Sequence, residues 1–557
     1  MTRKAFLAAV CWGVAVVSFT ALAEASESAS GPATVWQWST LVRGAREHTN
    51  EARAFLWIPP NCQKVRAVIL AQHNMEEISI LENPIFRRGM ADLGFAEVWC
   101  APPFDHLFRF DEGAGETFNG MMDDLANESG YDELRTAPVV GIGHSAAASW
   151  PYYFAAWNPE RTLAALSVSG QWPYVRNPVF SPDIWGDRNI DFIPCMETMG
   201  EYESANTWST EGLKERQQHP LMPLSMLANP AQGHFAATDK KVEYLVFYLK
   251  KAAQYRLPSD STAKLKPIDP TKTGWLVDKW RFNQEPTAPA APVGQYKGDP
   301  KQAFWFFDEE IAKTTEVYQA AYRGMKPQLL GYVQDGQVVP QRDTHQQVNL
   351  KFQPQEDGLT FQLTATFLDT VSGGSPRLAN WTGLPVGSPI GHASGGRPIS
   401  IDRICGPFVK LAPESFAVRF DKTGMSNGTR PLELWFAATH PGDSEYKPAV
   451  QQAQMLIPTR NTSGLEQHIA FPGIPDQKLG TDSVKLEATS DAKVPVYYYV
   501  LSGPATVDGN TLKLSAIPPR AKFPVKVTVV AWQWGRSVPP LLKTAEPVER
   551  TFLIVRP

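Results

Sequence analysis

The chain has 557 residues, which is too many for one hydrophobic core, so two to four domains are expected. Its composition is that of a globular protein, with 43% hydrophobic and 20% charged residues. The net charge is −4 and there is no long basic run, which argues against nucleic acid as a partner.

The N-terminal residues 1–23 have the pattern of an export signal. Two basic residues precede an apolar run over 5–17, and Ala21-Leu22-Ala23 supplies a small-x-small cleavage pattern. A membrane anchor is the alternative, but the run is short for a span and no later segment reaches about 18 apolar residues. We expect a mature protein that begins near Glu24, is periplasmic or extracellular, and has no stable membrane insertion.

Four cysteines remain once Cys11 leaves with the signal, and none of them has C-x-x-C spacing. The sequence therefore predicts neither a zinc site nor a dense disulfide framework, and no metal or cofactor is expected. Cys62 is expected to precede one parallel strand and Cys100 to end another. That would place them at opposite edges of a sheet, which argues against a disulfide between them.

Residues 52–258 alternate between apolar runs and helical patterns. Continuous apolar strands that alternate with helices predict a mostly parallel sheet covered on both faces. We assign the domain to residues 33–258. Strands are expected at 52–60, 65–72, 95–102, 137–143, 161–170, 191–199 and 223–230, and helices at 83–94, 115–129 and 239–255.

A linker is expected over 259–300, which is rich in Pro, Lys and Ala, although Trp275 and Trp280 leave an ordered path open. Residues 302–324 predict one amphipathic helix. The hydrophobic period then changes to two, and Asp335-Gly336 is a hairpin-turn signal. The region 301–463 is therefore predicted to be a helix followed by an antiparallel, β-sandwich-like domain.

Within that domain, the glycine-rich stretch 371–398 predicts a long loop. In one interpretation this loop covers the entrance to the active site and brings Trp381 into contact with the substrate. The alternative is a surface loop far from the catalytic residues.

The last region, 466–557, holds five or more short strand patterns with a turn at Asp508-Gly509. The stretches "HIAFPGIPDQKLGTDSVKLEATSD", "YYVLSGPATVDGNTLKL" and "RTFLIV" resemble the immunoglobulin-like modules of exported bacterial proteins. The resemblance implies an independently folded β-sandwich that serves attachment, spacing or docking and carries no catalytic residue.

A nucleophile is indicated by Gly143-His144-Ser145-Ala146-Ala147, which lies between a predicted strand and the helix-prone stretch "AASWPYYFAAW". It is the G-x-S-x-G elbow with alanine in the last place. Such a turn exposes the serine, which also needs a base and donors for the developing oxyanion. An ordinary serine on a strand-to-helix turn is the alternative.

The base and the acid are expected to follow Ser145 along the chain. His234 comes just after the strand at 223–230, on the sheet edge that carries Ser145, whereas His219 lies at the opposite edge. Glu203, three residues past Gly200, is the favoured acid because it follows the preceding strand. The other acids that this reasoning leaves open are Glu201, Asp183 and Asp187.

The order Ser…Glu…His, the elbow and the strand–helix alternation resemble the α/β-hydrolase superfamily over residues 52–258. The resemblance implies a Ser145–His234–Glu203 triad and an acyl-enzyme. It also implies an oxyanion hole formed by the Ala146 N–H and by Asn74 or Met75 in the loop "AQHNMEE". In that loop His73 is either structural or part of the site, and a metal site of His73, Glu76 and Glu77 is a much weaker alternative.

These expectations combine into a secreted serine esterase that cleaves carboxylic esters. By analogy alone, the appended β domains favour a carbohydrate ester or another polymer ester. Trp172, Trp185 and Trp208 could stack on such a substrate, although plain packing is the stronger interpretation of each. The alternatives are a serine peptidase of prolyl oligopeptidase type, for which no N-terminal propeller is visible, and a binding or adhesion protein on an inactive hydrolase scaffold.

Overall fold

The structure is a computed structural model of the chain. It describes residues 34–49, 51–203, 205–259, 264–342, 347–372, 382–395, 397–425 and 431–556. The predicted export signal and Trp381 lie outside the described residues. No helix within the described ranges is long and apolar enough to cross a membrane.

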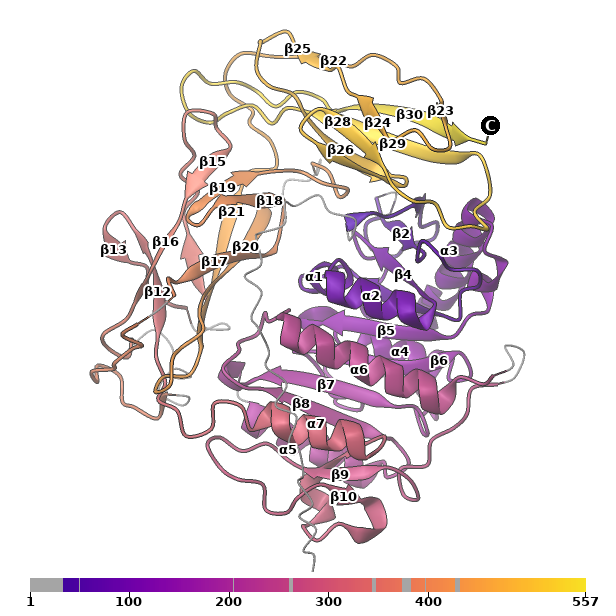
Figure 1. Cartoon of the computed structure of the whole chain (residues 1–557), viewed down its shortest axis with the longest axis vertical. Coiled ribbons are helices and arrows are strands. Elements are labelled where there is room, and N and C mark those ends of the chain that lie inside the picture. Colours follow the sequence, from indigo (N-terminus) through magenta and orange to yellow (C-terminus); the bar gives the residue numbers. More distant parts are fainter. Residues whose placement is uncertain are drawn as a thin grey trace, which may run out of the picture.

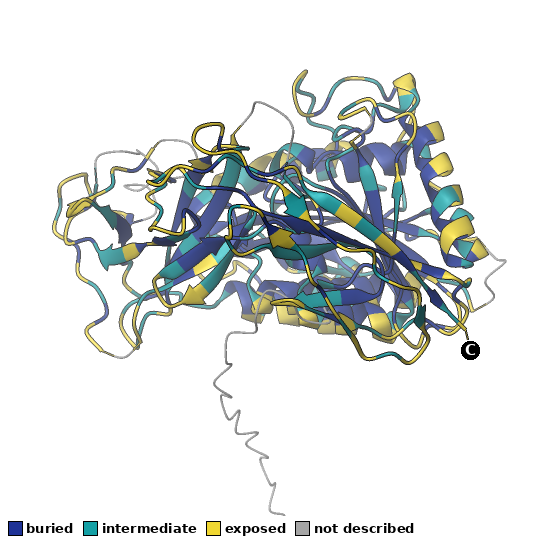
Figure 2. Cartoon of the chain, turned by 90° about the horizontal axis from the view of Figure 1, so that it is seen from above, coloured by how far each residue is buried: buried dark blue, intermediate teal, exposed yellow. Residues whose placement is uncertain are grey.

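An eight-stranded sheet forms the centre of the first domain, with the order β1-β2-β4-β3-β5-β6-β7-β8 (Figure 1). β1 and β2 are antiparallel to their neighbours, and β3 to β8 are parallel. Every residue of β3 to β8 is buried, as expected for a sheet covered on both faces. Figure 2 shows that buried strands fill the interior of the molecule. This strand order is that of the α/β-hydrolase fold predicted from the sequence. The strands are β1 Trp38–Leu41, β2 Arg53–Trp57, β3 Ala67–Gln72, β4 Phe95–Cys100, β5 Val139–His144, β6 Thr162–Val168, β7 Cys195–Gly200 and β8 Leu224–Asn229.

Helices cover the sheet and begin where the sequence provides caps. The Asn83 side chain accepts a hydrogen bond from the Ile85 N–H at 2.8 Å, and α2 ends at Gly94, whose φ is 69°. α2 packs closely on α6, because a Cβ on Gly89 would lie 2.4 Å from a Val246 methyl carbon. The helices are α1 Glu77–Leu81, α2 Pro84–Leu93, α3 Ala114–Ser129, α4 Trp150–Trp157, α5 Ala205–Gln218 and α6 Asp239–Arg256.

The segment expected as a linker and one long helix contains a small antiparallel sheet. Its strands are β9 Trp275–Asp278, β10 Ala291–Pro292 and β11 Ala303–Phe306. The single helix predicted over 302–324 is wrong at its start, because β11 is a fully buried strand and α7 Glu309–Gln319 begins only after Asp308. The Asp308 carboxylate caps α7 by accepting the Ile311 N–H at 3.1 Å.

The middle β domain is built from three small sheets, which lie to the left of the eight-stranded sheet in Figure 1. All their pairings are antiparallel except β14 with β21, which is parallel. The predicted hairpin is confirmed, since Asp335 and Gly336 both have positive φ between β12 and β13. The strands are β12 Leu330–Gln334, β13 Gln337–Val338, β14 Val348–Leu350, β15 Thr360–Gln362, β16 Thr364–Phe367, β17 Ser400–Cys405, β18 Phe408–Ala412, β19 Ser415–Val418, β20 Leu432–His440 and β21 Ala449–Ile457.

The C-terminal β region lies above both other parts in Figure 1. Its core is not separate from theirs, because Trp532 and Trp534 are buried in the core of the middle domain, with Phe420 at ring-centroid distances of 4.9 and 6.2 Å. An independent module, as expected from the sequence, would keep these rings within its own sandwich. The strands are β22 Ile469–Ala470, β23 Gln477–Lys478, β24 Ser483–Lys485, β25 Thr489–Ser490, β26 Tyr497–Ser502, β27 Ala505–Asp508, β28 Thr511–Leu514, β29 Val525–Trp532 and β30 Val548–Val555.

The four cysteines of the described chain are buried and none forms a disulfide. Cys62 precedes β3 and Cys100 ends β4, as the sequence predicted.

Candidate active site

Ser145 stands on a sharp turn directly after β5. Its φ is 53°, a left-handed conformation that a serine rarely adopts, and a single 3-10 turn, η4 Ser145–Ala147, leads toward α4. Gly143 is required here, because a Cβ at that position would lie 2.0 Å from the Ala147 carbonyl oxygen. Ala147, in the place of the last glycine of the motif, is fully buried. The sequence thus forms a strained elbow that leaves Ser145 partly exposed.

Three predicted residues meet at this elbow. His234 Nε2 lies 2.8 Å from Ser145 Oγ, and His234 Nδ1 lies 3.3 Å from Glu203 Oε2. His234 follows β8, and Glu203 ends the 3-10 turn η5 Glu201–Glu203 after β7. Their side chains are only 4% and 6% exposed. The three candidate residues therefore lie in the order serine, histidine, carboxylate, at the carboxyl edge of the parallel strands.

Glu201, the second candidate acid, faces away from the histidine. One of its carboxylate oxygens accepts the Ala231 N–H at 2.7 Å, and the other lies 2.5 Å from the Lys447 ammonium group. Glu201 and Lys447 are both buried. Glu201 therefore joins the catalytic domain to the middle domain, whereas Glu203 contacts His234.

The remaining candidates lie elsewhere. Asp183 and Asp187 are exposed, and Asp183 lies 3.7 Å from the Arg176 guanidinium. His219 stacks on the Tyr174 ring at a centroid distance of 3.5 Å. Asp183 and His219 thus contact Arg176 and Tyr174, and neither is in contact with Ser145 or His234.

In the loop after β3, the backbone N–H groups that were expected to bind an oxyanion are bonded to a carboxylate of the chain itself. The backbone N–H groups of Asn74 and Met75, expected as oxyanion donors, both donate to Glu77 Oε2, at 3.0 and 2.8 Å. Glu77 Oε1 also accepts the His144 N–H at 2.8 Å, so this carboxylate ties the loop to the strand that carries the nucleophile. Burial raises the pKa of Glu77 to about 7 even though these N–H groups lower it. Ala146, the other predicted donor, follows Ser145 on the same turn.

A buried charge cluster lies beside the histidine of the triad. Glu76 Oε2 is 3.4 Å from Lys241 Nζ and 3.7 Å from His144 Nε2, and His144 Nε2 is 3.1 Å from the His234 carbonyl oxygen. Glu76 thus faces a lysine rather than converging with His73 on one centre. No group of three or more metal-type ligands occurs within the described ranges.

The tryptophans near this edge are mostly packing residues. Trp172 and Trp185 are 1% and 2% exposed, and Trp172 stacks on Phe304 at 5.9 Å. Trp208 is partly exposed, and its indole N–H donates to Glu197 Oε1 at 3.2 Å. Plain packing is therefore the interpretation that the structure favours for Trp172 and Trp185.

The middle domain contacts the chain beside the acid of the triad. Tyr202, next to Glu203, donates its hydroxyl to the Pro448 carbonyl at 2.8 Å. The buried Glu201–Lys447 ion pair is on the same turn. Two neighbours of the acid are thus fixed by a domain that begins more than a hundred residues later in the sequence.

The middle domain also contacts the chain on both sides of His234. The Phe235 ring lies 4.7 Å from the Trp435 ring, and a Cβ on Gly233 would lie 2.4 Å from the Gln452 amide nitrogen. Sequence reasoning missed these neighbours, because a contact between distant segments has no local signature in either segment.

Part of the glycine-rich loop expected over 371–398 also lies near the site. Ile390 belongs to the same buried cluster as Tyr202 and Ala231, which come from the two catalytic loops. The interpretation of Trp381 as a substrate contact falls outside the described residues.

No family model matches the chain, and no curated protein matches it. Solved structures similar to it include a dienelactone hydrolase from Anabaena variabilis, with 15% identity, 40% of this chain and 98% of that chain covered, and a TM-score of 0.27. An S-formylglutathione hydrolase from Agrobacterium tumefaciens is 13% identical, with 37% and 90% covered and a TM-score of 0.28. A siderophore hydrolase from Aspergillus nidulans is 11% identical, with 42% and 98% covered and a TM-score of 0.29. The assignment of the α/β-hydrolase fold rests on the strand order and the elbow of this chain.

Proposed function

We propose that the protein is a serine hydrolase that cleaves carboxylic esters through Ser145, His234 and Glu203. The observation that carries the proposal is the 2.8 Å contact between Ser145 Oγ and His234 Nε2, with Glu203 3.3 Å from the other ring nitrogen. A strained serine bonded to an oriented histidine is the arrangement that nucleophilic acyl transfer needs.

In this mechanism His234 Nε2 accepts the Ser145 proton as Oγ attacks the ester carbonyl carbon. Glu203 holds the Nδ1–H tautomer and stabilises the imidazolium that forms. The tetrahedral intermediate then expels the alcohol, which takes the proton from His234, and leaves an acyl group on Ser145. Water attacks this acyl-enzyme with His234 again as base, and the acid is released.

The oxyanion is expected to bind the Ala146 N–H first. The second donor is proposed to come from Asn74 or Met75, whose amides are bonded to Glu77 in this structure. An oxyanion would have to take one of these amides from the Glu77 carboxylate. The carboxylate would keep its bond from the His144 N–H, so the loop would stay attached to β5.

For the substrate, we propose an ester of a carbohydrate or another polymer, cleaved outside the cytoplasm. Support comes from the predicted export signal over 1–23 and from the two β domains. Trp172 and Trp185 no longer support it, because both are buried.

The first test is Ser145→Ala, with turnover measured on a small acetyl ester and labelling measured with a fluorophosphonate. We expect turnover to fall on the order of 10⁴-fold or more and labelling to vanish, because the triad acts as a unit. Ser169→Ala is the matched control, since Ser169 follows β6 at the same edge with a φ of 50°. A folded Ser145→Ala protein that keeps more than about a tenth of the turnover would contradict the assignment.

A substrate panel then separates the alternatives. Acetyl, feruloyl and uronate esters are compared with peptide amides on the same preparation. Faster cleavage of the amides would favour the peptidase interpretation. A folded wild-type protein that neither reacts with the fluorophosphonate nor cleaves any ester would favour a binding protein on an inactive hydrolase scaffold.

A further inference from the structure

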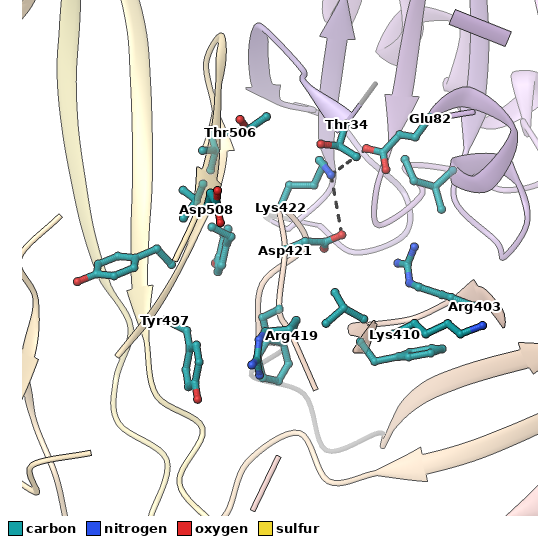
Figure 3. Close-up of a pocket in the computed structure, with 18 of the residues that line it drawn as sticks. Thr34, Glu82, Arg403, Lys410, Arg419, Asp421, Lys422, Tyr497, Thr506 and Asp508 are labelled. Atoms are coloured by element: carbon teal, nitrogen blue, oxygen red, sulfur yellow. Dashed lines mark hydrogen bonds and ion pairs between the residues drawn. The ribbon is translucent and has the colours of Figure 1, made fainter. Parts of the chain in front are cut away.

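A cavity of about 640 Å³ lies where the three parts of the chain meet (Figure 3). Its walls come from α1 of the catalytic domain, from β17, β18 and residues 419–422 of the middle domain, and from β26 and β27 of the C-terminal region. Ser145, His234 and Glu203 do not line it. The volume falls in the range of about 300–1,000 Å³ that is usual for small-molecule sites.

Most charged groups of the wall already have partners. Lys422 lies 2.9 Å from Glu82 and 3.9 Å from Asp421, and both contacts are drawn in Figure 3. Lys410 is bound by Asp402 at 2.8 Å. Outside the cavity, Lys513 binds Asp508 at 2.9 Å. The pairs Lys410–Asp402 and Lys513–Asp508 are each neutral, whereas Lys422 is shared by the two carboxylates of Glu82 and Asp421.

Arg403 and Arg419 are different, because neither forms an ion pair within the described ranges of the chain. Arg403 donates from Nε to the Gly406 carbonyl at 2.8 Å. Arg419 donates from one terminal nitrogen to the Val418 carbonyl at 2.8 Å. Each guanidinium is thus bonded to one backbone carbonyl and keeps further N–H donors that form no ion pair with a carboxylate of the described chain.

Arg419 is also held by ring stacking. Its guanidinium carbon lies 4.3 Å from the Tyr497 ring centroid, and that ring stacks on Trp532 at 5.0 Å. An arginine fixed in this way loses little conformational entropy when it binds a planar anion, and its fork matches a carboxylate in shape.

Arg403 also interacts electrostatically with Asp421, which is part of the cavity wall. Burial would raise the pKa of Asp421, but Lys422 and Arg403 hold it below its usual value. Polar groups such as Thr506 and Tyr499 share the remaining wall with apolar side chains such as Val409. A ligand for this surface needs negative charge, hydroxyl groups and some apolar ring surface.

We propose that this cavity binds a carboxylated oligosaccharide, with Arg403 and Arg419 as its carboxylate-binding residues. The site is adjacent to the loop after β3, because α1 follows that loop and Ser79 of α1 donates its hydroxyl to the Ile404 carbonyl, next to Arg403. Binding here requires no chemistry at Ser145, so the proposal is independent of the proposed esterase activity.

The test is calorimetric titration of the full chain with trigalacturonic acid, and with galactotriose as the neutral probe. We expect the acid to bind and the neutral sugar to bind about tenfold more weakly or not at all. Arg403→Met and Arg419→Met should each weaken binding of the acid by about tenfold or more, whereas Arg419→Lys, which keeps the charge but loses the fork, should weaken it less. Lys410→Met is the matched control and should stay within about twofold, because Asp402 already binds that ammonium group.

Three outcomes of these titrations would overturn the proposal, and a fourth concerns Ser145→Ala. They are no binding of the acid to the wild-type chain, equal binding of the neutral sugar, and binding that survives in both methionine variants. Thermal unfolding of each variant shows whether lost binding reflects lost folding, and Arg419→Lys remains informative if the methionine variants unfold. Ser145→Ala should bind the acid unchanged, and lost binding in that variant would place the ligand at the triad instead.

Discussion

The two β regions look alike in sequence but contact different parts of the catalytic domain. The middle domain reaches the triad loops, through Lys447 on the acid side and Trp435 on the histidine side. The C-terminal region instead contacts the far end of α3, where the Lys522 N–H donates to the Ser129 carbonyl at 2.9 Å and Arg520 lies 3.1 Å from Glu133.

The difference shows that β content does not by itself indicate a spacer or a targeting module. The middle domain fixes residues next to the acid and the base, so we infer that it positions the catalytic loops. The C-terminal region supports the middle domain, since Trp532 and Trp534 fill that domain's core. Its influence on catalysis is therefore expected to act through folding.

The largest effect is expected at the acid itself. Glu203→Gln should lower turnover of a small ester on the order of 10³–10⁴-fold, because an amide cannot stabilise the His234 imidazolium. Glu201→Gln should lower it by about tenfold or less, since Glu201 faces Lys447. Steady-state kinetics of the two variants decide the ranking. The reverse order would make Glu201 the acid, and two unimpaired variants would move the acid to the region after β6.

The next effect concerns the buried ion pair between the catalytic and middle domains. Lys447→Met leaves Glu201 buried without its cation, which should cost about 3–5 kcal/mol of unfolding free energy. Turnover should fall by about tenfold, because Glu201 and Glu203 share one 3-10 turn.

Denaturant unfolding and kinetics of Lys447→Met are compared with those of the double variant Glu201→Gln/Lys447→Met. The double variant should recover much of the stability, because no unpaired charge stays buried. If it recovers neither stability nor turnover, the pair does not act as a unit.

Trp534→Ala probes the core shared by the C-terminal region and the middle domain. We expect a loss of about 3–5 kcal/mol of unfolding free energy from the cavity that it leaves. Turnover per folded molecule on a small ester should stay within about threefold, since Trp534 lies in the core cluster that includes Phe420 and Phe436 and not beside the triad. A selective loss of turnover without loss of stability would contradict the supporting role of this region.

Arg520→Met is expected to have the smallest effect and serves as the counterpart of Lys447→Met. The Arg520–Glu133 pair is part-exposed, so its loss should cost no more than about 1 kcal/mol and leave turnover unchanged. Thermal unfolding and kinetics are measured in parallel with Lys447→Met. A drop in turnover as large as that of Lys447→Met would remove the distinction between the two β regions.

The sequence was sufficient for features that depend on neighbouring residues. Each parallel strand was predicted to within a few residues, because continuous apolar runs bounded by turns have few other structures open to them. The candidate triad was found for the same reason, since Ser145, Glu203 and His234 each follow a strand of one parallel sheet.

Features that depend on distant segments were not predictable. Nothing in the sequence around Lys447 distinguishes it from a surface lysine, and its contact with Glu201 forms only in the folded chain. The hydrogen bonds from the Asn74 and Met75 N–H groups to Glu77 depend on the orientation of the Glu77 side chain, which the sequence does not determine. The strand at 303–306 was missed because its aromatic residues fit the apolar face of a helix equally well.

The proline-rich segment that composition marks as a linker has a consequence for solubility. β8 is the last strand of the eight-stranded sheet, and it is covered by β11 and α7, which follow the segment. Ser225 donates to the Trp305 carbonyl at 2.5 Å, and the Ala228 N–H donates to the Gln319 side chain at 3.0 Å. The segment completes this cover, because its strand β9 pairs with β11. An uncovered strand edge is a template on which another chain can pair. Shortening this segment would therefore first cause self-association of the protein, before any loss of turnover.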